Sequence, residues 1–331
     1  MTAAPGSPAD KARLISSWQF RAVIISALLA AFGYLAVGLW SGWQNVALAI
    51  RDTGITGIGV ALALSLVNYG LRFCRWHMYL GAMGQRVPAW TSLRIYLAGF
   101  ALTTTPGKVG ELLRSALLVQ WAVPLKKSVA AFFSERLSDL LAIVLLALLG
   151  LAYHPRGQAW IAVGAAGLAA ALVVLSNQRL LGWFRRRVPG TNRASTALRH
   201  LTETLIEASR CNRPALLALA TAASVVAWAA EGFAFHIVLD RMGDPIPLAL
   251  AISIYAMAML AGALSFMPGG LGGAEAVMVA LLVWQGMDTG TAVAATLIIR
   301  LTTLWFAVVI GGAVVGSYAF RPRQPGGQSS T

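Results

Sequence analysis

Long uncharged apolar stretches are the feature that most constrains the fold of this chain. The first begins after Arg21 and reaches Ile50 without a charged residue, which is too long for a signal-peptide core. A hydrocarbon core roughly 30 Å thick requires about 20 apolar residues per helix. Of the 331 residues, 58% are apolar and 11% are charged, whereas a soluble domain has about 25% charged residues. The sequence therefore predicts an all-α polytopic membrane protein.

The apolar pattern predicts six spanning helices and two apolar regions that are broken in the middle. The six spans are expected at 21–41, 54–71, 128–151, 158–176, 215–239 and 290–317. The broken regions cover 88–122 and 247–286, with interruptions at Pro106-Gly107 and Pro268-Gly269-Gly270. Each broken region allows three interpretations, namely a kinked helix, two spans or a re-entrant hairpin.

The distribution of Lys and Arg predicts the topology. If both broken regions are re-entrant, the predicted cytoplasmic segments hold 18 basic residues and the opposite side holds only Arg51, Arg156 and Arg241. This asymmetry favours cytoplasmic termini. Two crossings per broken region would give the same sidedness, whereas a single crossing would place the basic segment 177–214 outside. The excess of 26 Lys and Arg over 12 Asp and Glu is then explained by topology and anionic lipid, not by nucleic acid.

The second half of the chain repeats the first at a shift of 164 residues. Glu111 falls on Glu275, and Arg136 falls on Arg300. Each half would contain three spans and one hairpin, so the second half would be inverted, as in many transporters. The predicted segments are a cytoplasmic tail 1–20, the first repeat with the first helix of the second 21–176, a basic linker 177–214, the rest of the second repeat 215–318, and a disordered tail 319–331.

Ten charged residues fall within predicted membrane segments. A charge at the bilayer centre costs from about 3 to over 10 kcal/mol, so these residues are functional candidates by default. The cations are Arg94, Lys108, Arg114, Arg136 and Arg300, and the carboxylates are Glu111, Glu135, Asp139, Glu231 and Glu275. The alternative is that they only hold the helices together.

The first break resembles an anion site in its local pattern. Lys108, Glu111 and Arg114 share one face of a helix that begins at Pro106-Gly107, with Gly110 in its first turn. A helix N-terminus beside a lysine attracts anions. The second break offers another N-terminus, where Gly272 allows close backbone approach, but Glu275 would oppose an anion there unless it is protonated or paired.

Two like charges, Glu135 and Asp139, lie four residues apart on one helical face and require cations nearby. Their expected partners are Arg136 and Arg300. Arg72 and Arg75 close the second span together with Trp76, either as snorkelling interfacial anchors or as a lipid-headgroup site.

Motifs for enzymatic or metal chemistry are absent from the sequence. We find no zinc-binding HExxH helix, nucleophile elbow or phosphate-binding loop. The two cysteines, Cys74 and Cys211, imply neither a disulfide framework nor a zinc site. No cofactor, metal site or enzymatic activity is therefore expected.

Four motifs together resemble the lysylphosphatidylglycerol synthase transmembrane region family, the flippase-like domain of bacterial inner membranes. They are Arg72 to Trp76, Pro106 to Arg114, Glu135 to Asp139, and Pro268 to Glu275. The resemblance implies movement of aminoacylated phosphatidylglycerol between leaflets. Aminoacyl transfer in that family belongs to a separate soluble domain and is not expected here. Free-standing relatives are linked to other lipids, including hopanoids and polyprenyl-phosphate glycolipids.

The expected function is therefore a lipid flippase or transporter of a bacterial inner membrane that does not use ATP. The cations would neutralise a lipid phosphate, while the carboxylates would balance them in the empty state and one would carry a coupling proton. The expected partners are membrane lipids, with a lipid-synthesising enzyme as a further candidate. Two alternatives remain open, an intramembrane enzyme acting on lipid phosphates and a non-catalytic accessory subunit. The oligomeric state is left open.

Overall fold

The described part of the chain is entirely helical in its regular elements. The computed structural model describes residues 43–104, 109–151, 167, 213–265 and 267–319, and no strand occurs among them. This confirms the all-α prediction. The predicted spans 21–41 and 158–176, the two terminal tails and nearly all of the linker lie outside the described residues.

Three long helices are apolar enough to cross a membrane by length and composition: Gln44–Ala82, Ala215–Arg241 and Thr289–Ser317. They correspond to α2 (Trp43–Ala82), α9 (Pro214–Arg241) and the succession of α12 (Thr289–Arg300), a π-helical turn η5 (Leu301–Trp305) and α13 (Phe306–Ala319). A further helix of 27 residues, α5 (Leu125–Leu151), carries five charged side chains, two of them in its first turn. The described chain therefore belongs in a membrane as a multi-pass protein.

Helix α2 corrects the predicted span 54–71. Regular helix begins at Trp43 and is interrupted only at Gly54, whose φ of 66° is readily adopted by glycine. The helix then continues without a break to Ala82. Arg72, Arg75 and Trp76 therefore lie within this helix and not at its C-terminal end.

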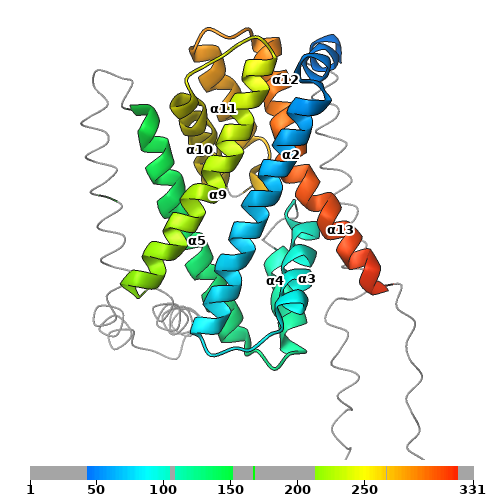
Figure 1. The fold of residues 1–331 in the computed structure, drawn as a ribbon, viewed down its shortest axis with the longest axis vertical. Helices are drawn as coiled ribbons and strands as arrows, with labels where there is room; N and C mark the ends of the chain where they lie inside the picture. The colour runs from blue at the N-terminus through cyan, green and yellow to red at the C-terminus, as the bar shows by residue number, and fades with distance from the viewer. Residues whose placement is uncertain (1–42, 105–108, 152–166, 168–212, 266, 320–331) are drawn as a thin grey trace, which may run out of the picture.

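Short helices occupy both broken regions. The first contains α3 (Ala89–Ala98), a 3-10 turn η2 (Gly99–Leu102) and α4 (Val109–Val119); the second contains α10 (Leu248–Leu264), η4 (Pro268–Gly270) and α11 (Gly273–Trp284). At about 1.5 Å per residue, α3, α4 and α11 are too short to cross a bilayer. In Figure 1, α3 and α4 lie together in the lower half and α10 and α11 in the upper half. This arrangement agrees with hairpins that enter from opposite faces, while the inverted repeat itself stays a prediction.

The two breaks meet near mid-height. A β-carbon added to Gly269 would lie 3.4 Å from the carbonyl oxygen of Thr103 and 3.5 Å from Cα of Thr104. Gly269, Gly270 and Gly272 all have positive φ values, of 62°, 70° and 84°. Because L side chains rarely adopt such angles, glycine at the second break meets a backbone requirement as well as a spatial one.

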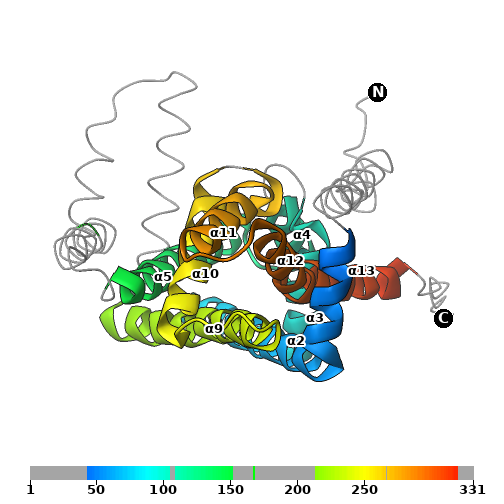
Figure 2. The ribbon, with the colours of Figure 1, turned by 90° about the horizontal axis from the view of Figure 1, so that it is seen from above.

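Seen from above, α2 and α9 run alongside one another, and α11 and α12 lie on the opposite side of the bundle (Figure 2). One apolar core packs α9, α10, α11 and α12 around residues such as Phe235 and Met278, and a second packs α2, α3 and α4 around Trp76 and Tyr96. These two apolar cores hold the helices in place, and buried charged side chains lie between the helices.

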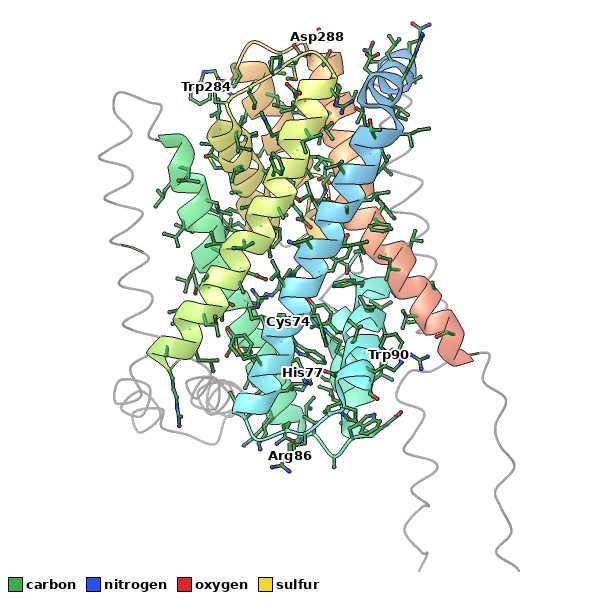
Figure 3. The ribbon with its side chains drawn as sticks, in the orientation of Figure 1. Cys74, His77, Arg86, Trp90, Trp284 and Asp288 are labelled. Carbon is green, nitrogen blue, oxygen red and sulfur yellow. The ribbon has the colours of Figure 1, made fainter. Side chains whose placement is uncertain are left out.

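Exposed tryptophans mark the two ends of the bundle. Trp90 at the start of α3 is 71% exposed and Trp284 at the end of α11 is 70% exposed. Figure 3 shows Trp90 on the lower part of the molecule and Trp284 at the upper end, near Asp288. Amphipathic indole rings concentrate at membrane interfaces, so these two residues are suited to the boundaries of the hydrocarbon layer.

Candidate functional site

A cluster of buried charges forms where α2 crosses α5. Arg72 and Arg75 are three residues apart and therefore share one face of α2, and Glu135 and Asp139 share one face of α5 in the same way. The Arg75 side chain is fully buried, and those of Glu135 and Asp139 are 1% and 5% exposed. Arg75 and Trp76 are buried, and the charges of Arg72 and Arg75 are paired inside the bundle, which does not fit snorkelling anchors. The alternative, a lipid-headgroup site, stays a prediction.

Arg75 lies at the centre of this cluster. Its Nη1 lies 2.5 Å from Oδ1 of Asp139, and its Nη2 lies 3.7 Å from Oε1 of Glu135. Nη1 also donates to the hydroxyl of Ser224 on α9. One arginine thus ties three helices together and is the partner that both acidic residues share.

Asp139 receives further donors. Nη2 of Arg72 lies 3.6 Å and Nη2 of Arg136 lies 3.2 Å from its Oδ2. The indole N–H of Trp228 donates to Oδ1 at 3.0 Å, and the guanidinium of Arg72 lies over the Trp228 ring at 5.2 Å from its centroid. The Asp139 carboxylate is therefore surrounded by donors from α2, α5 and α9.

Arg114 brings the first hairpin into the cluster. From α4 its Nη1 lies 3.2 Å from Oε2 of Glu135. Its guanidinium faces the rings of Trp76 and Tyr96 at 5.6 Å and 5.0 Å, an arrangement that favours a cation. A β-carbon at Gly99 would lie 2.8 Å from Cγ of Arg114, so glycine there leaves room for this side chain.

We call this group the arginine cluster. Its described members are Arg72, Arg75, Arg114, Arg136, Glu135 and Asp139. The four arginines exceed the two carboxylates by two positive charges. Several buried arginine nitrogens have no hydrogen-bond partner among the described residues, namely Nε of Arg72, Nε and Nη2 of Arg75, and Nε of Arg136. Surplus charge and unused donors in a buried place favour an anionic ligand.

Access to the cluster differs between its arginines. Arg75 is fully buried, whereas the side chains of Arg72, Arg114 and Arg136 are 16%, 12% and 36% exposed. Arg75 therefore serves to hold the helices and carboxylates in place. The other three are the arginines that a ligand can reach.

A second, smaller group lies at the second break, and we call it the upper ion pair. Nε of Arg300 at the end of α12 lies 2.7 Å from Oε1 of Glu275, and its Nη2 donates to the carbonyl oxygen of Gly269 at 3.1 Å. The other carboxylate oxygen of Glu275 accepts from the backbone N–H of Gly272 at 2.7 Å. Arg300 thus binds the broken segment to α12.

This geometry corrects one expected pairing. Arg300 was expected to neutralise Glu135 and Asp139, but it pairs with Glu275, because α12 packs against α11 and the arginine cluster is already supplied by α2 and α4. At the N-terminus of α11, Glu275 accepts from the backbone N–H of Gly272 and is paired with Arg300, so its charge is compensated within the protein.

A known protein family matches most of this chain. The family described as "Lysylphosphatidylglycerol synthase TM region" matches residues 22–311. The chain belongs to this family. It is also similar to a UPF0104 membrane protein of Methanothermobacter thermautotrophicus (strain Delta H), with 22% identity over 322 residues that cover 87% of this chain and 94% of that protein. The resemblance inferred from the sequence motifs is thereby confirmed.

The remaining predicted site residues of this lysylphosphatidylglycerol synthase TM family member are dispersed. Arg94 on α3 donates to the hydroxyl of Ser317 near the end of α13, away from the cluster, at an exposed position. Gly110 lies in the first turn of α4, and Pro268, Gly269 and Gly270 form η4. Lys108, Pro106 and Gly107 lie outside the described residues, as does the side chain of Glu111.

Three polar contacts were not predicted for this family member. Ser224 and Trp228 on α9 bind the arginine cluster, and the Tyr255 hydroxyl on α10 donates to Glu231 at 2.7 Å. The spacing of Ser224, Trp228 and Glu231 places all three on one face of α9. That periodic polar stripe within an apolar helix was the available signal.

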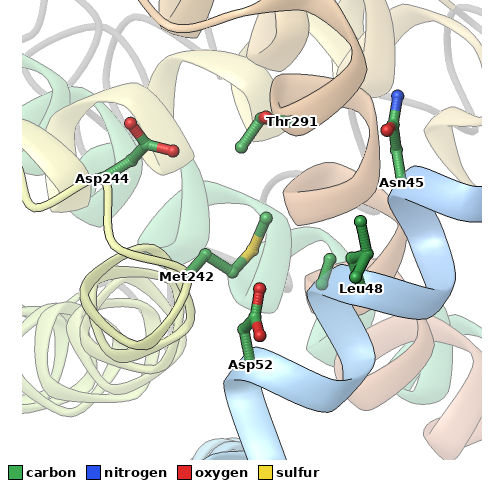
Figure 4. Close-up of a pocket in the computed structure, with 7 residues that line it drawn as sticks. Asn45, Leu48, Asp52, Met242, Asp244 and Thr291 are labelled. Carbon is green, nitrogen blue, oxygen red and sulfur yellow. The ribbon is translucent and has the colours of Figure 1, made fainter.

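A small pocket lies at the other end of the bundle, with a volume of about 150 Å³ (Figure 4). It is lined by Asn45, Leu48, Ala49, Asp52, Met242, Asp244 and Thr291. Asp52 and Arg72 are separated by 20 residues of α2, or about 30 Å along the helix. The pocket is therefore distinct from the arginine cluster. Among the described residues no group of His, Cys, Asp and Glu is arranged to hold a metal ion.

Proposed function

We propose that this chain moves a phosphate-bearing lipid between the leaflets of a bacterial inner membrane without hydrolysing ATP. The observation that carries this proposal is the surplus of two positive charges among the described members of the arginine cluster. In a bilayer such a surplus is costly unless an anion compensates it. A lipid phosphate is the anion that a membrane supplies in quantity.

The cluster is suited to binding a phosphate. Arg72, Arg114 and Arg136 are partly exposed and come from three different helices, α2, α4 and α5. Arginine guanidinium groups bind phosphate oxygens through paired N–H donors. Because Arg114 belongs to the hairpin, a phosphate held between it and the long helices would bridge an element of the first break to the body of the bundle.

Transport agrees better with this geometry than lipid-phosphate chemistry does. Glu135 and Asp139, the carboxylates next to the arginines, are each held by two or more arginines. A general base must be placed to take a proton from its substrate, whereas these two carboxylates face the arginines. We therefore propose that the chain is not an enzyme, that its partners are membrane lipids and the enzyme that makes them, and that both termini are cytoplasmic.

Reconstitution tests the proposal. Purified protein in liposomes is given a panel of fluorescent lipids, and leaflet exchange is followed by chemical quenching of the outer leaflet while mass spectrometry follows lipid mass. Exchange of an intact phosphate-bearing lipid is expected, and Arg136→Gln should slow it by about tenfold or more. Arg86→Gln, at an exposed position in the loop between α2 and α3 (Figure 3), is the matched control and should match wild type.

The same experiment separates the alternatives. A changed lipid mass would replace transport with enzymatic activity. Exchange that is equally fast in wild type and Arg136→Gln would remove the arginine cluster from the mechanism. No exchange, together with stable co-purification of a lipid-synthesising enzyme, would indicate an accessory subunit.

A further inference from the structure

Glu231 is the buried carboxylate that the arginine cluster does not hold. It lies on α9, is 5% exposed, and accepts a hydrogen bond of 2.7 Å from the Tyr255 hydroxyl of α10. No ion pair to Glu231 within 4.0 Å occurs in the part of the chain that the structure describes. A lone buried carboxylate in a membrane protein is expensive when ionised, which makes its protonation state sensitive to any nearby charge.

The other described carboxylates in the membrane segments differ in this respect. Glu135 lies next to Arg75 and Arg114, Asp139 next to three arginines, and Glu275 next to Arg300. Each of these three carboxylates has a direct cationic partner. Glu231 has a neutral hydroxyl as its partner, so it is the group that can gain or lose a proton at the smallest structural cost.

Glu231 also interacts electrostatically with the arginine cluster. Trp228, which donates to Asp139 and lies under Arg72, is three residues before Glu231 on the same face of α9. The groups that act on Glu231 come from each helix packed against α9: Arg72 and Tyr69 from α2, Asp139 from α5, Tyr255 from α10 and Arg300 from α12. Arg72 is common to Glu231 and to the ligand-accessible side of the cluster.

We infer that Glu231 is the proton-coupling site of this protein, and that binding of an anionic lipid phosphate at the arginine cluster is coupled to uptake of a proton by Glu231. This inference rests on the proposed function. An anion placed beside Arg72 weakens the attraction that stabilises ionised Glu231, and so favours its protonated form. By linkage the converse holds, and protonation of Glu231 tightens binding of the phosphate. No bond other than that to the proton is made or broken.

The test is the pH dependence of lipid affinity. A short-chain phosphatidylglycerol is titrated into purified protein in detergent between about pH 8 and about pH 5; its phosphodiester keeps one negative charge throughout. Wild-type affinity should rise by about tenfold or more as the pH falls. Glu231→Gln, which resembles the protonated side chain, should bind at the high pH as tightly as wild type binds at the low pH, with no pH slope.

Two further variants complete the design. Asp288→Asn, a carboxylate-to-amide change at the N-cap of α12 and distant from the cluster, should keep the wild-type slope. Tyr255→Phe removes the donor that favours ionised Glu231, and should move the midpoint of the affinity change to higher pH. This second variant keeps the inference testable if Glu231→Gln does not fold.

The outcomes separate the two proposals. Binding by wild type with no pH slope, or an equal slope in Glu231→Gln, would overturn the coupling role and leave the proposed transport intact. Failure of wild type to bind any phosphate-bearing lipid would overturn the proposed function and the coupling role together.

Discussion

The arginine cluster and the upper ion pair differ in their balance of charge. The cluster has four described arginines and two carboxylates, whereas the upper ion pair has Arg300 and Glu275 in equal number. The balanced pair is fully used within the protein, since Arg300 also binds the carbonyl oxygen of Gly269. Intramembrane charges therefore differ in kind here: the balanced charge holds a broken helix, and we propose that the surplus charge binds a ligand.

The largest effect is expected within the cluster, at its fully buried member. Arg75→Met would leave Asp139 and Glu135 with only the partly exposed Arg72, Arg114 and Arg136 as partners, and breaking a buried pair costs about 3–5 kcal/mol. Chemical unfolding in detergent should show a loss of this size. Arg86→Met, at an exposed position, is the control with little expected change. A loss below about 1 kcal/mol would mean that the cluster does not organise the helices.

A somewhat smaller loss is expected at the upper ion pair. Arg300→Met and Glu275→Gln should each reduce stability by about 2–3 kcal/mol, because each leaves a partly buried charge or donor unpaired. The double variant should lose much less than the sum, since the remaining partner is gone too. Additive losses in the double-mutant cycle would show that the two side chains do not act as a pair.

Arg114 should affect ligand binding more than stability. Arg114→Lys keeps the charge but loses the planar group that faces Trp76 and Tyr96. Affinity for an anionic short-chain lipid should fall about tenfold, or about 1.4 kcal/mol, with affinity for an uncharged lipid as the control. Equal loss for both lipids would mean that the lysine disturbs the hairpin and not phosphate recognition.

The smallest changes in stability are expected at two glycines, one in the second break and one in regular helix. Gly269→Ala should destabilise by about 1 kcal/mol, because its φ of 62° strains an L residue. Gly59→Ala in α2, where a β-carbon meets nothing within 4 Å, should instead stabilise by about 0.5–1 kcal/mol. Thermal unfolding of both variants checks the opposite signs, and a stabilising Gly269→Ala would contradict the conformation of the second break.

The sequence predicted the positions of helices better than it predicted the ion-pair partners of charged side chains. Apolar length located α5 and α9 within a few residues, and the Pro-Gly-Gly pattern located the second break. Ending the second span at Leu71 failed because charge usually marks a membrane boundary, whereas Arg72 and Arg75 are compensated by residues 60 or more positions later in the chain. Such compensation depends on tertiary packing, which periodicity does not contain.

Pairing of the other charges shows the same limit. Glu135 and Asp139 were correctly expected to need cations, but three of the four arginines around them come from α2 and α4. The choice of Arg300 failed because α12 lies beside α11 and not beside α5. Local spacing reveals that a charge needs compensation, and only the fold decides which charge provides it.

The most direct test of the central claim is a structure determined in lipid discs that contain a single phosphate-bearing lipid. Headgroup density is expected at the arginine cluster, with phosphate oxygens within hydrogen-bond distance of Arg114 and of Arg72 or Arg136, and no such density is expected in Arg136→Gln. Density for the headgroup at the pocket between Asn45 and Asp244, with the arginine cluster unoccupied, would contradict it.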